Sequence, residues 1–291
     1  MAKAYSQSRH LHVGRLFVYL SLAVVALFYL MPLWVMVVTS LKPLDEIYGG
    51  SFIGFPKTIT LDAWRSAWSE ACIGTQCTGL KPYFVNSLLL VIPAVTLSTV
   101  IGALNGYILT KWKFAGSNFV FGLLLFGCFL PYQAILIPMA HTLGLLGLAG
   151  SIPGLILVHV SYGICFTTLF FRNYFVSVPD ELTKAALIDG AGFFHIFWSI
   201  ILPTALPIIV VSCIWQFTQI WNDFLFGVSF TSGSSSPITV ALNNIVNVTT
   251  GRKQYNVDMA AAMIAAVPTL FVYIIAGRYF VRGLTAGAVK G

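Results

Sequence analysis

An acidic residue, Asp223, lies inside an apolar run of this 291-residue chain, directly after Trp221 and Asn222. A charge at the centre of a bilayer costs about 2.5 to 3.5 kcal/mol on insertion scales, so such a residue faces a bundle interior or a water-filled cavity. A ring, an amide and a carboxylate can stack on and hydrogen-bond to a sugar. The three residues therefore fit either a sugar path or a capped helix break with the tryptophan at the membrane interface.

Other polar residues give weaker signals. Asn243 and Asn244 precede the last apolar run and suit sugar contact, but a solvated loop explains them equally well. His141 and His159 are isolated and lack the spacing of a metal site. We therefore expect structural or interfacial histidines and no metal centre.

The sequence lacks the residue patterns of an enzyme. It has no GxxxxGK[ST] loop to hold ATP and no cluster of an acid, a base and a nucleophile. The formal net charge is +7, but the positive residues are scattered between long uncharged runs. Catalysis within the membrane and a nucleic-acid partner are both disfavoured by these patterns.

Cys72 and Cys77 enclose a short polar segment, whereas the other cysteines lie in apolar runs. A disulfide between these two residues fits a loop in an oxidising compartment, and two free thiols fit equally well. Their role in either case concerns the fold.

The overall composition places these residues in a membrane protein. Hydrophobic residues make up 58% of the chain and charged residues only 9%, against about a quarter charged in soluble domains. A helix needs roughly 20 apolar residues to cross the hydrocarbon, and the uncharged run 17–41 is too long for a signal peptide. We predict an all-α, polytopic fold with six spans, at 16–40, 83–110, 117–138, 152–172, 205–229 and 257–280.

Within the second span, Gly102 and Gly106 form a GxxxG pair, which predicts close helix packing. Asn86 and Asn105 lie in the same span and predict hydrogen bonds to other helices.

Six spans place both termini on one side, and Lys and Arg are more numerous in the segments on that side. The excess predicts that both termini are cytoplasmic. The expected organisation is a cytoplasmic N-terminus at 1–15, a transmembrane domain at 16–282 and a cytoplasmic tail at 283–291. The main connecting segments are an inner loop at 173–204 and outer loops at 41–82 and 230–256.

The inner loop combines a helix start, a small-residue turn and an aromatic helix. Pro179 and the acids after it suit the first turn of a helix, and Gly190 permits a sharp turn. The segment 193–202 then offers aromatic residues at helical spacing before Pro203. By residue chemistry alone, this loop fits a helix resting on lipid headgroups and a docking element for another protein equally well.

The same loop resembles the cytoplasmic EAA coupling loop of binding-protein-dependent ABC importer permeases. One position departs from the family pattern, since Lys184 stands where an acidic residue normally precedes the two alanines. The segments 221–227 and 255–291 are similar to the carbohydrate-uptake branch, in particular to the second permease of the maltose type. The residues that the resemblance assigns to ATPase coupling are Glu181, Lys184, Ala185, Ala186, Asp189, Gly190 and Ala191.

The resemblance implies a type I ABC importer permease fold and a non-catalytic subunit of an ATP-driven sugar importer in the bacterial inner membrane. The implied partners are a second, different permease, a periplasmic sugar-binding protein, membrane lipid and two ATPase subunits that bind ATP and Mg. This chain itself is then expected to bind no cofactor. A monosaccharide of the glucose or mannose type is favoured.

The alternative is an autonomous sugar facilitator or an ion-coupled carrier. Ion coupling calls for several charges inside the membrane, whereas Asp223 stands alone in the interior of the predicted spans. A free-standing carrier also has no need of a docking loop.

Overall fold

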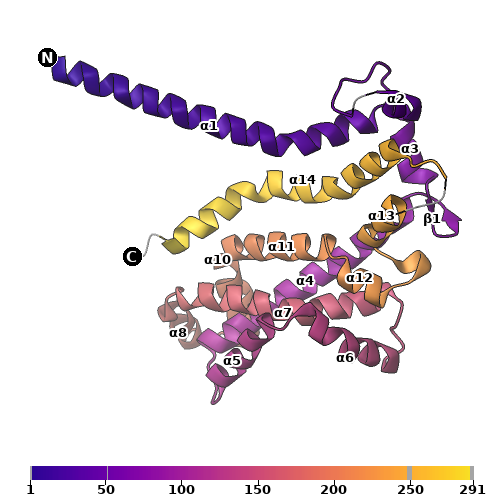
Figure 1. Ribbon diagram of the computed structural model, residues 1–291. Coiled ribbons are helices and arrows are strands. Elements are labelled where there is room, and N and C mark those ends of the chain that lie inside the picture. Colours follow the sequence, from indigo (N-terminus) through magenta and orange to yellow (C-terminus); the bar gives the residue numbers. More distant parts are fainter. Residues whose placement is uncertain (1, 51, 248–250, 289–291) are drawn as a thin grey trace. The chain divides into compact units, whose positions relative to one another are not determined.

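The computed structural model describes residues 2–50, 52–247 and 251–288, with side chains from residue 14 to residue 277 of these ranges. The expected tail at 283–291 therefore lies partly outside the described residues, and helix continues through residue 288. Contacts divide the chain into two units, Met1–Ala71 with Val248–Ile264, and Cys72–Asn247 with Ala265–Gly291 (Figure 1).

In the first unit, the segment that follows the first helix contacts residues at the start of the last helix. It contains α1 (Ala2–Ser40), α2 (Leu44–Gly49), α3 (Asp62–Ser69) and the beginning of α14 (Tyr255–Ala288). Asn256 Nδ2 donates to the Lys42 carbonyl at 3.1 Å. Arg252 lies 2.8 Å from the Asp45 carboxylate and 4.2 Å above the Tyr48 ring.

The second unit holds most of the helices and a two-stranded hairpin. In the hairpin, Cys72 pairs with Cys77 across the strands, and a disulfide joins them. The elements of this unit, besides the rest of α14, are β1 (Cys72–Ile73), β2 (Gln76–Cys77), α4 (Lys81–Lys111), α5 (Ser117–Cys128), α6 (Tyr132–Leu145), α7 (Ile152–Val176), α8 (Asp180–Ile188), α9 (Phe193–Ile196), the π-helix η1 (Phe197–Ile201), α10 (Leu202–Thr204), α11 (Leu206–Trp221), α12 (Leu225–Phe230), the 3₁₀ turn η2 (Gly233–Ser235) and α13 (Ile238–Val246).

The expected membrane-spanning, helical fold class is confirmed, although the hairpin adds a small β element. Within the described residues, four helical segments are long and apolar enough to cross a membrane, and two bent helix pairs bring the number to as many as six. The four segments are Gly14–Ser40, Lys81–Lys111, Ile152–Val176 and Tyr255–Gly277.

Two of the expected spans, at 117–138 and 205–229, contain breaks in the helix. α5 and α6 meet at an angle of 104°, because Pro131 has no N–H to donate and disfavours helix in the residue before it. α11 ends at Trp221, and α12 begins only at Leu225. Apolar length alone gave no sign of either break.

Close packing of α4 on α7 organises the second unit. A Cβ added at Gly102 would lie 2.2 Å from Thr167 Oγ1, and one at Gly106 would lie 2.7 Å from Phe171 Cβ. Asn105 Nδ2 donates to Thr168 Oγ1 at 3.2 Å. The predicted close packing and the interhelical bond of Asn105 are confirmed.

Asn86 plays a different part from the one expected. Its amide donates to the Ser234 carbonyl at 2.6 Å and the Ser236 carbonyl at 3.0 Å. These acceptors belong to η2 and the residue after it, so Asn86 secures the segment before α13 to α4 instead of joining two spanning helices.

Gly102→Ala is expected to lower the stability of the folded protein by roughly 1–3 kcal/mol, because overpacking a tight contact forces the backbone apart. The matched control is Gly122→Ala in α5, where no heavy atom lies within 4 Å of the added Cβ. Thermal unfolding of the purified protein in detergent compares the two variants. Equal melting temperatures would contradict the close contact of α4 with α7.

Candidate functional site

The segment 180–191, which we call the α8 turn, forms a short helix and a sharp reversal. α8 follows Pro179 and carries Asp180 and Glu181 in its first turn, where the helix dipole favours negative charge. Gly190 adopts a φ of +79°, a left-handed conformation that glycine reaches without strain. The Ala191 N–H then bonds back to the Ala186 carbonyl at 2.9 Å, which closes the turn.

The α8 turn has one buried face and one exposed face. Ala186 is 6% exposed and joins a core cluster with Phe175 and Phe197. On the open side, Ile188 is 86% exposed and Leu187 is 47% exposed. The expected coupling residues Glu181, Lys184, Ala185, Asp189 and Gly190 are all exposed as well.

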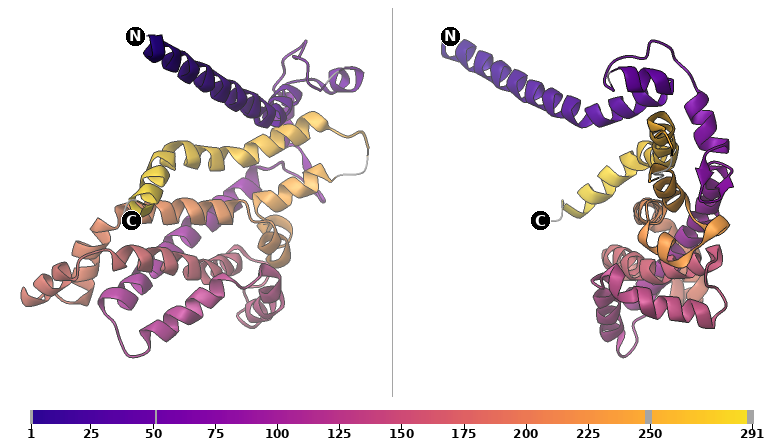
Figure 2. Two further views of the ribbon diagram at one scale, coloured as in Figure 1. Left: turned by 60° about the vertical axis from the view of Figure 1, so that its left-hand side comes forward. Right: turned by 45° about the vertical axis from the view of Figure 1, so that its right-hand side comes forward.

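The aromatic helix after this turn rests on α4. Ring centroids of Phe193 and Phe197 lie 5.1 and 5.4 Å from that of Tyr107. The segment passes through η1 and meets α11 at a bend of 81°. In Figure 1, α8 lies at the end of the second unit opposite α12, and the left view of Figure 2 shows the same separation. The α8 turn therefore lies away from α12 and the segment that follows it.

A salt bridge ties α8 to the end of α4. Lys111 Nζ lies 2.6 Å from Asp180 Oδ1, and its side chain is only 3% exposed. The same ammonium donates to the Val178 carbonyl. Because Lys111 donates a hydrogen bond to the carboxylate and attracts its charge, the pKa of Asp180 is lowered from its ordinary value.

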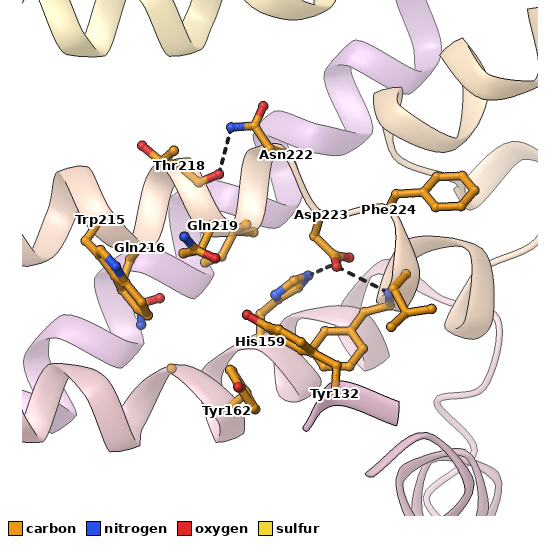
Figure 3. Close-up of a pocket in the computed structure, with 14 residues that line it drawn as sticks. Tyr132, His159, Tyr162, Trp215, Gln216, Thr218, Gln219, Asn222, Asp223 and Phe224 are labelled. Carbon is orange, nitrogen blue, oxygen red and sulfur yellow. Dashed lines mark hydrogen bonds and ion pairs between the residues drawn. The ribbon is translucent and has the colours of Figure 1, made fainter. Parts of the chain in front are cut away.

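A pocket of about 320 Å³ lies in the second unit between α7, α11, α12 and the start of α6 (Figure 3). Aromatic and polar side chains both line it, and none of the lining residues is Lys or Arg. They are Tyr132, His159, Tyr162, Gly163, Trp215, Gln216, Thr218, Gln219, Ile220, Asn222, Asp223, Phe224, Leu225 and Phe226.

Asp223 occupies the break between α11 and α12 at one end of this pocket. Its two carboxylate oxygens accept the N–H groups of Phe226 at 3.3 Å and Gly227 at 3.0 Å, and so cap α12. His159 Nε2 lies 3.6 Å from Asp223 Oδ2 across the pocket (Figure 3). The capped break, one of the two alternatives that the sequence left open, is therefore present, and the same residue lines the pocket.

Of the other residues expected on the sugar path, one lines the pocket and three do not. Asn222 lines the pocket and donates to the Thr218 carbonyl at 2.9 Å. Trp221 is 2% exposed and lies outside the pocket lining, where its indole N–H donates to the Ala265 carbonyl at 2.8 Å. Asn243 and Asn244 are exposed on α13, also outside the pocket lining.

Sequence reasoning missed most of the residues that line the pocket. His159, expected to be structural or interfacial, is 6% exposed and lines the pocket, and its Nε2 makes no hydrogen bond. Gln216 and Tyr162 also line it. Helical spacing could have put His159 and Tyr162 on one face of α7, but nothing in the sequence indicated that α11 faces them.

Among the described residues, no group of three or more His, Cys, Asp or Glu is placed to hold a metal ion. The pocket lining offers hydrogen-bonding groups and aromatic faces. Such a lining suits recognition of a small organic ligand.

The family of inner membrane components of binding-protein-dependent transport systems matches residues 98–285. This match covers more than half of the chain, so the chain belongs to that family. Its α8 turn and bent helix pairs are therefore features of a transporter subunit.

Two relatives and one solved structure agree with this assignment. A probable ABC transporter permease of Pyrococcus horikoshii is 40% identical over 284 residues, which cover 97% of this chain and 100% of the relative. The xylose/arabinose import permease XacI of Haloferax volcanii is 36% identical over 230 residues, which cover 72% of this chain and 74% of the relative.

The solved structure is the crystal structure of a bacterial ABC transporter involved in the import of the acidic polysaccharide alginate. One of its chains matches with a TM-score of 0.81 at 18% identity, over 92% of this chain and 97% of that chain. The chain thus has the type I ABC importer permease fold.

Lys111→Met is expected to loosen α8, because it removes the salt bridge and the bond to the Val178 carbonyl. In the unmodified protein, the contact is present above the ordinary pKa of an aspartate and is lost as the pH falls through the lowered pKa of Asp180. Hydrogen exchange of residues 180–188, corrected for intrinsic rates, measures both effects. Lys113→Met, at an exposed lysine nearby, is the control, and equal exchange in the two variants would contradict the tether.

Proposed function

We propose that this chain is a permease subunit of an ATP-driven, binding-protein-dependent sugar importer. The observation that carries the proposal is the α8 turn, whose outer face combines exposed Ile188 and Leu187 with small residues at a tight reversal. Exposed apolar side chains grouped at one place are typical of an interaction surface. An autonomous facilitator or ion-coupled carrier has no use for such a surface.

The partners of this subunit follow from the proposal. Two ATPase subunits bind ATP and Mg, and one of them docks on the α8 turn through Glu181, Lys184, Ala185, Asp189 and Gly190, with Ala186 and Ala191 supporting the turn from behind. Closure of the ATPases moves this turn, and the helices it contacts transmit the motion as alternating access. Lys184 presents a positive charge to the ATPase at that surface.

A second, different permease completes the membrane part, and a periplasmic sugar-binding protein delivers the sugar. The subunit lies in the bacterial inner membrane, in contact with lipid, and both termini are cytoplasmic. The transmembrane domain is taken as 16–282, with the inner loop at 173–204 facing the cytoplasm and the outer loops at 41–82 and 230–256 facing the binding protein.

The substrate is proposed to be a sugar, with a monosaccharide such as glucose or mannose favoured. The similarity to a xylose/arabinose import permease supports a sugar. Asn222 and Asp223, which line the pocket, are proposed to lie on the sugar path, and Trp221 is proposed to hold α11 beside it. Asn243 and Asn244 are proposed to face the binding protein from α13.

Ile188→Glu and Asp189→Arg are expected to reduce copurification of the ATPase subunits at least tenfold, because each puts a new charge on the docking surface. Ile59→Glu provides the matched control, since Ile59 is 70% exposed in the outer loop and Ile188 is 86% exposed in the α8 turn. Affinity purification of the co-expressed complex measures the ATPase recovered. Full recovery and full transport in both α8-turn variants would show that the α8 turn is not the docking element.

The sugar is identified by ATP hydrolysis of the purified complex with its binding protein and a panel of sugars. Glucose or mannose is expected to stimulate hydrolysis severalfold, whereas disaccharides give little stimulation. Sugar flux through this chain alone, without ATPase subunits, would instead establish the facilitator.

A further inference from the structure

The pocket contains two deeply buried side-chain nitrogens without hydrogen-bond partners. Gln216 is 2% exposed and His159 is 6% exposed, and neither the Gln216 Nε2 nor the His159 Nε2 makes a hydrogen bond. Asp223 Oδ2 lies 3.6 Å from the His159 Nε2, which is within the range of an ion pair with a protonated histidine but longer than a hydrogen bond. A buried donor left unpaired costs about 1–3 kcal/mol, so two such groups on one pocket indicate a ligand that supplies acceptors.

The chain makes specific room for one of these donors. Gly163 on α7 lies directly against the Gln216 amide, and a Cβ at that position would be 2.1 Å from Nε2. Any side chain at residue 163 would displace the amide. The position of Gln216 beside the pocket therefore depends on a glycine in the facing helix.

Aromatic rings form much of the remaining wall. Tyr132 and Tyr162 are stacked with centroids 4.6 Å apart, and Phe226 meets Tyr132 edge-on at 5.2 Å. Trp215 lines the pocket from α11. The negative faces of such rings attract the weakly positive C–H groups of a saturated ring.

The charges around the pocket select the class of ligand. Asp223 faces the pocket, and no residue lining it is Lys or Arg, so a ligand carboxylate would be repelled by Asp223 and would find no Lys or Arg to pair with. An ammonium group has only donors to offer, so it cannot itself accept from Gln216 or His159. A neutral hydroxyl-bearing ring accepts from both donors and also donates to Asp223.

We propose that this pocket is a binding site, within this chain, for the ring of a neutral monosaccharide. Gln216 and His159, in the tautomer with its proton on Nε2, donate to ring hydroxyl oxygens, and Asp223 accepts from another hydroxyl. At about 320 Å³ the pocket is at the small end of ordinary ligand sites, which suits one ring. This proposal rests on the proposed sugar import and specifies the substrate class as a neutral monosaccharide.

The test measures sugar binding to the complete permease–ATPase complex in nanodiscs, without the binding protein. Equilibrium dialysis compares radiolabelled D-glucose and D-mannose with the charged sugar D-glucuronate. We expect a neutral hexose to bind at least tenfold more tightly than D-glucuronate. Tighter binding of D-glucuronate, or no binding of either hexose, would overturn the proposal.

Gln216→Met and His159→Phe each remove one unpaired donor. We expect each to weaken hexose binding about two- to tenfold, as loss of one hydrogen bond does, while the melting temperature without sugar stays the same or rises. Gly163→Ala, which displaces the Gln216 amide, is expected to weaken binding similarly. The matched controls are Gln133→Met and His141→Phe, at exposed residues outside the pocket lining.

The outcomes separate this site from the proposed function. If the unmodified complex imports a hexose with its binding protein and ATP, but the pocket variants bind hexose as well as the controls do, the site is wrong and sugar import stands. If the unmodified complex imports no sugar under those conditions, the proposed function is wrong, and the proposed sugar site is then wrong as well.

Discussion

The candidate site depends on a break between two helices, α11 and α12, within an apolar segment. Inside a membrane, backbone groups freed at a helix break have no bulk water to bind and need partners from the protein. Asp223 supplies these partners, because both of its carboxylate oxygens accept N–H groups of α12. The same residue brings a carboxylate to the end of a pocket that is otherwise lined by aromatic, uncharged polar and aliphatic residues and by His159. A structural requirement of the backbone thus also provides a hydrogen-bonding group for a ligand.

The position of that pocket depends on how tightly the helices approach one another. Gly102 and Gly106 allow α4 to pack directly on α7, and Gly163 on another part of α7 gives space to Gln216 of α11. Van der Waals contact and interhelical hydrogen bonds hold helices together in lipid, where the hydrophobic effect contributes little. Small residues on α7's neighbours and on α7 itself therefore determine which side chains meet in the pocket.

The α8 turn and the pocket are mechanically linked through the same helices. Lys111 holds the start of α8 to the end of α4, and the aromatic helix after α8 packs on Tyr107 before the chain bends into α11. A displacement of the α8 turn would thus reach α4 and α11 through packed side chains. In the proposed importer, this chain of contacts is the route by which an ATPase on the α8 turn would act on the pocket.

Composition and apolar length determined by themselves that this is a helical membrane protein, and the residue pattern 179–193 determined a short helix followed by a glycine turn, since burial in lipid and turn chemistry are local properties. The GxxxG contact of α4 was also predictable, because close helix packing needs small residues at that spacing. The breaks after Cys128 and Trp221, the burial of Trp221 and the meeting of His159 with Asp223 were decided only by the tertiary structure. These features depend on which helix faces which, and a pairing between residues 64 positions apart leaves no periodic signal in a single sequence.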